Sequence, residues 1–84
     1  MKLQISSQVL REQDAVAYYD EATRICYFGI RTASYCGSLA SGMIPDLEMI
    51  THILNHEIMH DVLNIHFGRE VSLQLDNVTR RGLQ

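Results

Sequence analysis

Residues 52–66 read HILNHEIMHDVLNIH and contain all four histidines of the chain. No glycine or proline follows Pro45 until after this stretch, so the pattern predicts one long helix that begins near Pro45. At about 100° per residue, the histidines His52, His56 and His60 fall on one face of that helix. We therefore expect the rest of the 84-residue chain to pack against this helix.

The helix also carries an apolar stripe on the side opposite His56. Within about 20° of that side lie Leu47, Leu54, Ile58 and Ile65. A stripe of this kind normally faces a core. Because Met49 and Leu63 lie beside the histidines on the other side, the pattern predicts a helix that is buried between two layers.

The residues before the helix alternate as strands do. We expect a first strand at residues 3–5, with an extension to Leu10 left open, and a hairpin of strands at 15–19 and 24–30 around a polar turn. Residues 32–44 are expected to form a loop, because residues 32–42 are mostly small and include two glycines and three serines. The residues after Gly68 fit either a short strand at 71–75 or a final helix.

The predicted fold is therefore a single α+β domain over residues 1–84, in which a small, mainly antiparallel sheet packs on one long helix. The length leaves no room for a second domain. A core of this size seldom supplies more than about 3 to 5 kcal/mol, so a bound metal or a partner subunit would add useful stability.

Composition excludes several classes of protein. The formal net charge is −3, so the chain lacks the excess of basic residues that nucleic-acid binding needs. No apolar run approaches the roughly 20 residues of a membrane span. The N-terminus has no apolar signal-peptide core, which predicts a cytoplasmic protein. Cys26 and Cys36 are then expected to be unreactive thiols.

The segment His56-Glu57-Ile58-Met59-His60 is an HExxH motif. A spacing of four residues places the two imidazoles one helical turn apart, where both can bind one Zn²⁺ ion. Glu57 follows the first ligand and can reach a zinc-bound water, whose pKa the metal lowers to about 7. The motif thus predicts a metal site with Glu57 as general base.

A third protein ligand must come from outside the motif. If the helix ends near Leu63-Asn64, His66 can turn back toward the metal. If the helix instead continues to a stop at Gly68, Glu70 becomes the candidate. We expect His66 to be the ligand and keep Glu70 as the alternative; His52 should line the site rather than bind metal.

With these residues in place, the chain resembles the zincin metallopeptidases. HEIMHDVLNIH is similar to the metzincin signature HExxHxxGxxH, although Leu63 replaces its glycine and no methionine follows to form a Met-turn. The upstream hairpin is similar to the one that precedes the HExxH helix in small zincins, where an edge strand holds an extended peptide. The resemblance implies zinc bound by His56, His60 and His66, with Glu57 as the catalytic base.

The resulting hypothesis is a zinc-dependent metallopeptidase acting on a peptide or protein substrate, with residues 24–30 or the paired strand positioning that substrate. The alternative is a non-catalytic, zinc-stabilised interaction or regulatory domain, which a fourth ligand from His52 or Cys36 would favour. A third hypothesis is that a homo-oligomer or a partner chain completes the cleft.

Overall fold

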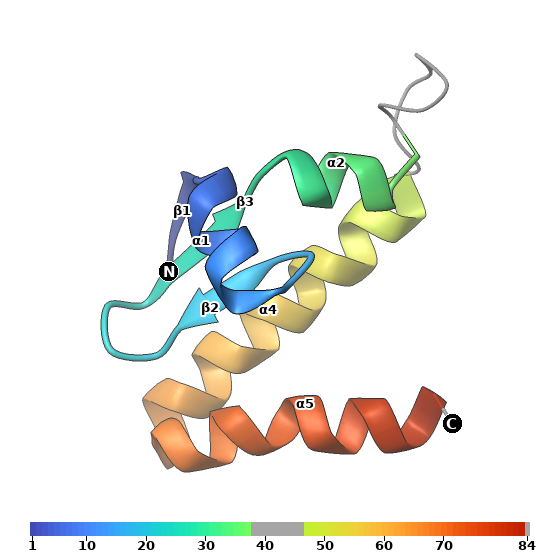
Figure 1. Ribbon diagram of the computed structural model, residues 1–84. Coiled ribbons are helices and arrows are strands. Elements are labelled where there is room, and N and C mark those ends of the chain that lie inside the picture. The colour runs from blue at the N-terminus through green and yellow to red at the C-terminus, as the bar shows by residue number, and fades with distance from the viewer. Residues whose placement is uncertain (38–46, 84) are drawn as a thin grey trace.

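The computed structural model describes residues 1–37 and 47–83, which form a small α+β fold. In chain order the elements are β1 (Lys2–Ile5), α1 (Ser7–Gln13), β2 (Tyr18–Asp20), β3 (Ile25–Phe28), α2 (Ile30–Tyr35), α4 (Leu47–Phe67) and α5 (Arg69–Leu83). The sheet and α1 lie on one side of α4, and α5 runs back beneath it (Figure 1). The expected α+β class is confirmed.

The three strands form a mixed sheet in the order β1-β3-β2. β2 and β3 are the expected antiparallel hairpin, with Tyr19 opposite Cys26. β1 instead pairs in parallel with β3, which corrects the expectation of a mainly antiparallel sheet. Parallel neighbours need a long connection between them, and the segment from α1 through β2 supplies it.

The first strand does not extend to Leu10, because α1 begins directly after β1. The Ser6 hydroxyl accepts a hydrogen bond from the Val9 amide and caps the new helix, and Leu10 is fully buried. The expected loop at 32–44 is also partly wrong, since α2 occupies Ile30–Tyr35. The remainder of that loop prediction, and the predicted start of the long helix at Pro45, lie outside the described residues.

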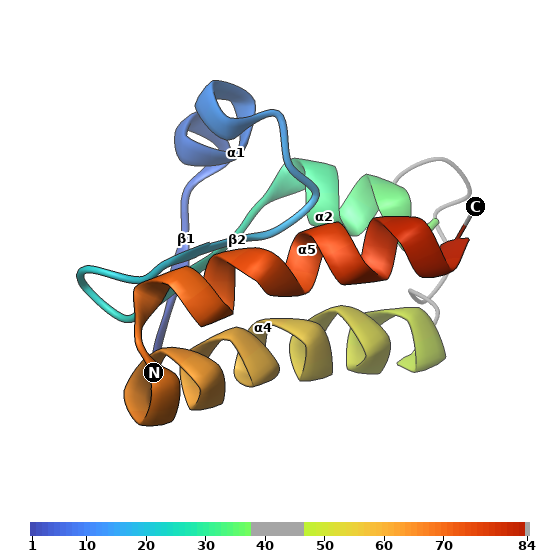
Figure 2. The same ribbon diagram turned by 90° about the horizontal axis from the view of Figure 1, so that it is seen from below.

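The two long helices form a hairpin around Gly68. The expected break near Leu63-Asn64 does not occur, because α4 continues to Phe67. Gly68 has a φ of 95°, a left-handed conformation that suits glycine, and α5 follows at once. In Figure 2 the two helices run side by side in opposite directions. The alternative of a final helix is thus confirmed over the 71–75 strand.

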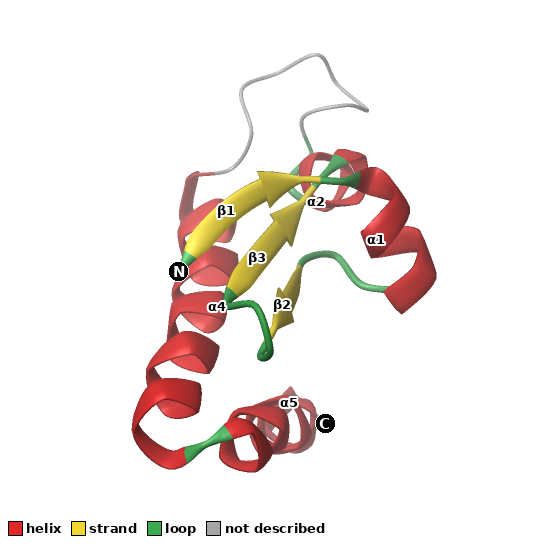
Figure 3. Cartoon of the chain, turned by 90° about the vertical axis from the view of Figure 1, so that its left-hand side faces the viewer, coloured by secondary structure: helices red, strands yellow, loops and turns green. Residues whose placement is uncertain are grey.

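The buried face of α4 is not the predicted one. Its buried residues are Ile53, Glu57, His60 and Asp61. By contrast, Leu47, Ile58 and Ile65 of the predicted apolar stripe are 69%, 41% and 52% exposed. Leu54, the fourth member of the stripe, is half-buried. The sheet and α5 approach adjacent sides of α4 rather than opposite sides, as Figure 3 shows. Despite this apolar face, no helix among the described residues is both long enough and apolar enough to cross a membrane.

The described interior is as polar as it is apolar. Its apolar members are Leu10, Tyr19, Cys26, Cys36 and Ile53, and its polar members are Thr32, Glu57, His60, Asp61 and Ser72. Burying such groups is costly unless each is hydrogen-bonded. Among the described residues, no fully buried side-chain nitrogen or oxygen lacks a partner. Hydrogen bonds join His60 to Ser72, and Asp61 to Tyr19 and Arg24, so two polar networks lie beside the HExxH segment.

Candidate metal centre

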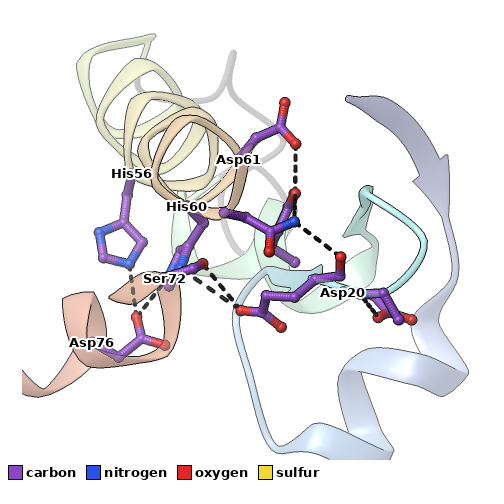
Figure 4. Close-up of polar contacts among 10 residues, drawn as sticks. Asp20, His56, His60, Asp61, Ser72 and Asp76 are labelled. Carbon is purple, nitrogen blue, oxygen red and sulfur yellow. Dashed lines mark hydrogen bonds and ion pairs between the residues drawn. The ribbon is translucent and has the colours of Figure 1, made fainter. Parts of the chain in front are cut away.

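Two histidines of α4 and one aspartate of α5 converge on one point. The Nε2 atoms of His56 and His60 lie 2.9 Å and 3.1 Å from the same atom, Oδ1 of Asp76. One ligand atom from each residue lies within 4.8 Å of the other two. Figure 4 shows both imidazoles projecting from α4 toward Asp76 on the facing helix.

This arrangement fits a small divalent metal ion. Ligands bound about 2.0 Å from a tetrahedral Zn²⁺ ion stand about 3.3 Å apart, close to the two distances between imidazole nitrogen and carboxylate oxygen. Two imidazoles and one carboxylate are also a donor set that catalytic zinc sites use. Without a metal, the carboxylate accepts a hydrogen bond from the N–H group at each Nε2 atom, and metal binding would displace both of those protons.

The hydrogen bonds between Asp76 and the two histidines shift the pKa values within this group. The hydrogen bond from His60 holds the pKa of Asp76 at about 2, well below its usual range, and His56 acts in the same direction. Burial lowers the pKa of His60, but the hydrogen bond and charge of Asp76, together with the charges of Glu57 and Glu21, outweigh burial, so the pKa of His60 is raised. Asp76 is thus an anion at neutral pH, in contact with both imidazoles.

Glu57 lies beside this group in the interior. It is 6% exposed, and burial is the main cause that raises the pKa of its carboxyl group, partly opposed by His60 and His56. Among the described residues, none forms a hydrogen bond with its carboxylate. A carboxylate with a raised pKa and free acceptor atoms can take a proton from a water molecule near the metal position.

The group opens onto a cavity of about 450 Å³ between α4, α5 and the hairpin. Lining residues include His56, Glu57, His60 and Asp76 together with Tyr18 and Tyr19 of β2. β3 is paired on both sides, whereas β2 pairs only with β3 in the described part of the sheet. Of the two hairpin strands, β2 therefore has a free edge beside the cavity.

Residues from three elements fix the ring of His60. Its Nδ1 atom lies 2.9 Å from the Ser72 hydroxyl, which donates to Oε1 of Glu21 at 3.2 Å. The ring of Tyr19 stacks on the imidazole, with ring centres 5.9 Å apart and planes 10° from parallel. Ser72 comes from α5, Glu21 from the turn after β2 and Tyr19 from β2. These contacts occupy Nδ1 and one face of the ring, while Nε2 faces Asp76.

A second network anchors the hairpin to the same helix. The Asp61 carboxylate accepts hydrogen bonds from the Tyr19 hydroxyl and from Nε and Nη2 of Arg24, the latter at 2.9 Å and 3.2 Å. Asn64 donates to the backbone oxygen of Glu21 at 2.9 Å. Asp61 is 7% exposed and joins α4 to the sheet.

The structure brings together His56, Glu57 and His60 as expected but not His66. His66 lies in the last turn of α4, exposed and against Phe67, because the helix continues through it and turns its side chain away. Glu70 is exposed at the start of α5. In the described parts of the chain, neither residue joins the donor group, which consists of His56, His60 and Asp76.

The two candidates for a fourth protein ligand also lie apart from the donor group. His52 is exposed and lines the cavity, in agreement with its expected role. Cys36 is buried, and over residues 1–37 and 47–77 neither it nor His52 belongs to the donor group. The described part of the chain therefore places three potential metal ligands beside an open cavity.

One signal in the sequence points to Asp76. In a helical hairpin centred on Gly68, His60 lies eight residues before the turn and Asp76 eight residues after it, so the two stand at the same height. Glu21 has no comparable signal, because its position depends on how the β-hairpin docks on α4 and α5. The chain matches no known family model, no curated protein and no solved structure.

Proposed function

We propose that the chain is a zinc-dependent metallopeptidase of the zincin type, with the metal held by His56, His60 and Asp76. The observation that carries the proposal is the convergence of three ligand atoms within 4.8 Å beside the buried carboxylate of Glu57. Asp76 takes the place first considered for His66 or Glu70. The exposed cavity supports catalysis over a purely structural metal, because a catalytic metal keeps one position open.

Each residue has a defined role in the proposed reaction. A bound zinc ion supplies Lewis acidity and lowers the pKa of water toward neutrality. Glu57 accepts a proton from the attacking water and passes it to the leaving amine. His56, His60 and Asp76 hold the metal through atoms that already face one another. The free edge of β2 holds the substrate peptide in an extended conformation along the cavity.

The metal site is tested by zinc content and zinc affinity. We expect one zinc ion per chain by native mass spectrometry, and a loss of affinity of at least 100-fold in Asp76→Asn and His60→Ala. His66→Ala and Glu70→Gln are matched controls and should bind as tightly as the wild type. Equal weakening by His66→Ala and Asp76→Asn would contradict the proposed ligand set.

Catalysis is tested separately with Glu57→Gln. This variant should keep its zinc and lose hydrolysis of a mixed peptide library by about 10²- to 10⁴-fold, because the general base is gone. Glu12→Gln removes a charge from the exposed surface of α1 and should leave the rate unchanged. Zinc binding without hydrolysis in the wild type would favour the alternative of a zinc-stabilised interaction domain.

A further inference from the structure

Glu21 is a buried acid that the proposed chemistry does not use. Its side chain is 7% exposed, although it belongs to the turn between two strands. Asn64 holds this turn in place by donating to the Glu21 carbonyl oxygen. Oε1 of Glu21 lies 3.2 Å from the Ser72 hydroxyl and 4.0 Å from Nδ1 of His60. A carboxylate is rarely buried at a turn unless a polar partner holds it there.

The direction of the hydrogen bonds follows from counting protons. A carboxylate only accepts, so the single hydroxyl proton of Ser72 goes to Glu21. With that proton used, the Ser72 oxygen can only accept from its other neighbour, Nδ1 of His60 at 2.9 Å. His60 must therefore carry a proton on Nδ1. Ser72 is fully buried, so water does not compete for these bonds.

We propose that Glu21, acting through Ser72, is a positioning residue that keeps a proton on Nδ1 of His60 and so reserves Nε2 for the metal. The inference rests on the metal site proposed above. In the metal-free chain Nε2 also carries a proton, which it donates to Asp76 and which a metal would displace. An imidazole without its Nδ1 partner could rotate, or could release the Nδ1 proton and keep the one on Nε2, the atom that the metal needs. Partners of this kind typically change metal affinity 10- to 100-fold when they are removed.

The first test reads the proton on His60 directly. In the metal-free wild-type chain, ¹⁵N NMR of the imidazole should show Nδ1 of His60 protonated, with slow exchange of that proton with water. Exchange should become fast in Ser72→Ala and in Glu21→Ala. A bare Nδ1 atom in the wild type would overturn the proposal, and this result does not depend on whether zinc binds.

The second test measures zinc affinity by competition with a chromogenic chelator. Ser72→Ala and Glu21→Ala should each weaken zinc binding 10- to 100-fold, and the double variant should be little worse than either single variant, because both act through one chain of bonds. Glu21→Gln keeps an acceptor oxygen and should recover part of the affinity. Glu12→Gln is the charge-matched control and should bind like the wild type.

Thermal unfolding of the metal-free variants separates positioning from folding. Variants that fold like the wild type but bind zinc 10-fold more weakly support the proposal. Variants with unchanged affinity would overturn it while leaving the metal site itself intact. If the wild type bound no zinc, the proposed function would fail. The NMR measurement of the Nδ1 proton would still show whether Glu21 and Ser72 hold that proton on His60.

Discussion

At the scale of single residues, Asp61 shows how much of this fold depends on one buried carboxylate. It accepts hydrogen bonds from Arg24 and Tyr19, and the N-terminal amine lies 3.5 Å from its Oδ2 atom. The Arg24 guanidinium holds the pKa of Asp61 at about 2, well below its usual range. Burial and the same carboxylate raise the pKa of the Tyr19 hydroxyl to about 12.

The lowered pKa of Asp61 predicts a loss of stability in acid. A group whose pKa is depressed by folding stabilises the folded state above its unfolded pKa of about 3.9, and this contribution disappears as the pH falls through about 2. Urea unfolding at pH 6, 4 and 2 should therefore show Asp61→Asn less stable than the wild type, with a gap that narrows toward pH 2. A gap that stayed constant over this range would contradict the charged network.

Cys26 gives a second prediction at this scale. The thiol is fully buried, and burial raises its pKa to about 12. Iodoacetamide at pH 8 should leave Cys26 unmodified in the folded chain and alkylate it rapidly in denaturant, as peptide mapping by mass spectrometry can measure. Rapid labelling of Cys26 without unfolding would show that the sheet does not seal it from water.

At the scale of elements, α4 has two candidate apolar faces, and the fold buries neither one whole. Its buried side includes Ile53, Glu57 and Asp61. The sheet and α5 both pack against α4 (Figure 3). The sequence pattern instead predicts burial of the stripe that contains Ile58 and Ile65, because the spacing of apolar residues along one helix can be read from the sequence. Which side of a helix meets a neighbour depends on residues elsewhere in the chain.

The buried face of α4 predicts unequal effects of the same substitution at two positions. Ile53 is 9% exposed and Ile65 is 52% exposed. Ile53→Ala should lower the free energy of unfolding by about 2 to 4 kcal/mol, whereas Ile65→Ala should change it by less than about 0.5 kcal/mol. Urea unfolding curves measure both. Equal losses at the two positions would mean that the Ile65 side of the helix is covered in solution.

At the scale of the whole molecule, the proposed metal would link α4 to α5. Two ligands come from α4, the third comes from α5, and only the turn at Gly68 joins these helices in sequence. The apolar interior described here is small, so a metal bridge would contribute a large share of the stability.

This arrangement predicts strong stabilisation by zinc. With free zinc at about 100 times its dissociation constant, the folded state gains about 2.7 kcal/mol, or roughly 10 to 20 °C in the unfolding temperature. Differential scanning calorimetry with zinc and then with excess chelator measures the gain and its reversal. Asp76→Asn should show almost no shift, and an undiminished shift in that variant would place the metal elsewhere.

The sequence alone determined the features that depend on neighbouring residues. The long helix, the hairpin of β2 and β3 and the shared face of His56 and His60 follow from local periodicity and turn residues. Each of these features involves residues a few positions apart, whose geometry the backbone fixes. The same holds for Gly68, which was one of two predicted ends of the long helix, because a glycine readily adopts the left-handed conformation that ends a helix.

Tertiary structure decided the features that join distant segments. Pairing with β3 made β1 a parallel strand, and docking of α5 beside α4 brought Asp76 to the two imidazoles while α4 carried His66 away from them. Ser72, which contacts His60, lies 12 residues from it in the sequence, and Glu21, which contacts Ser72, lies 51 residues from Ser72. Such contacts depend on which faces of packed elements meet, and that choice minimises the free energy of the whole chain rather than of any one segment.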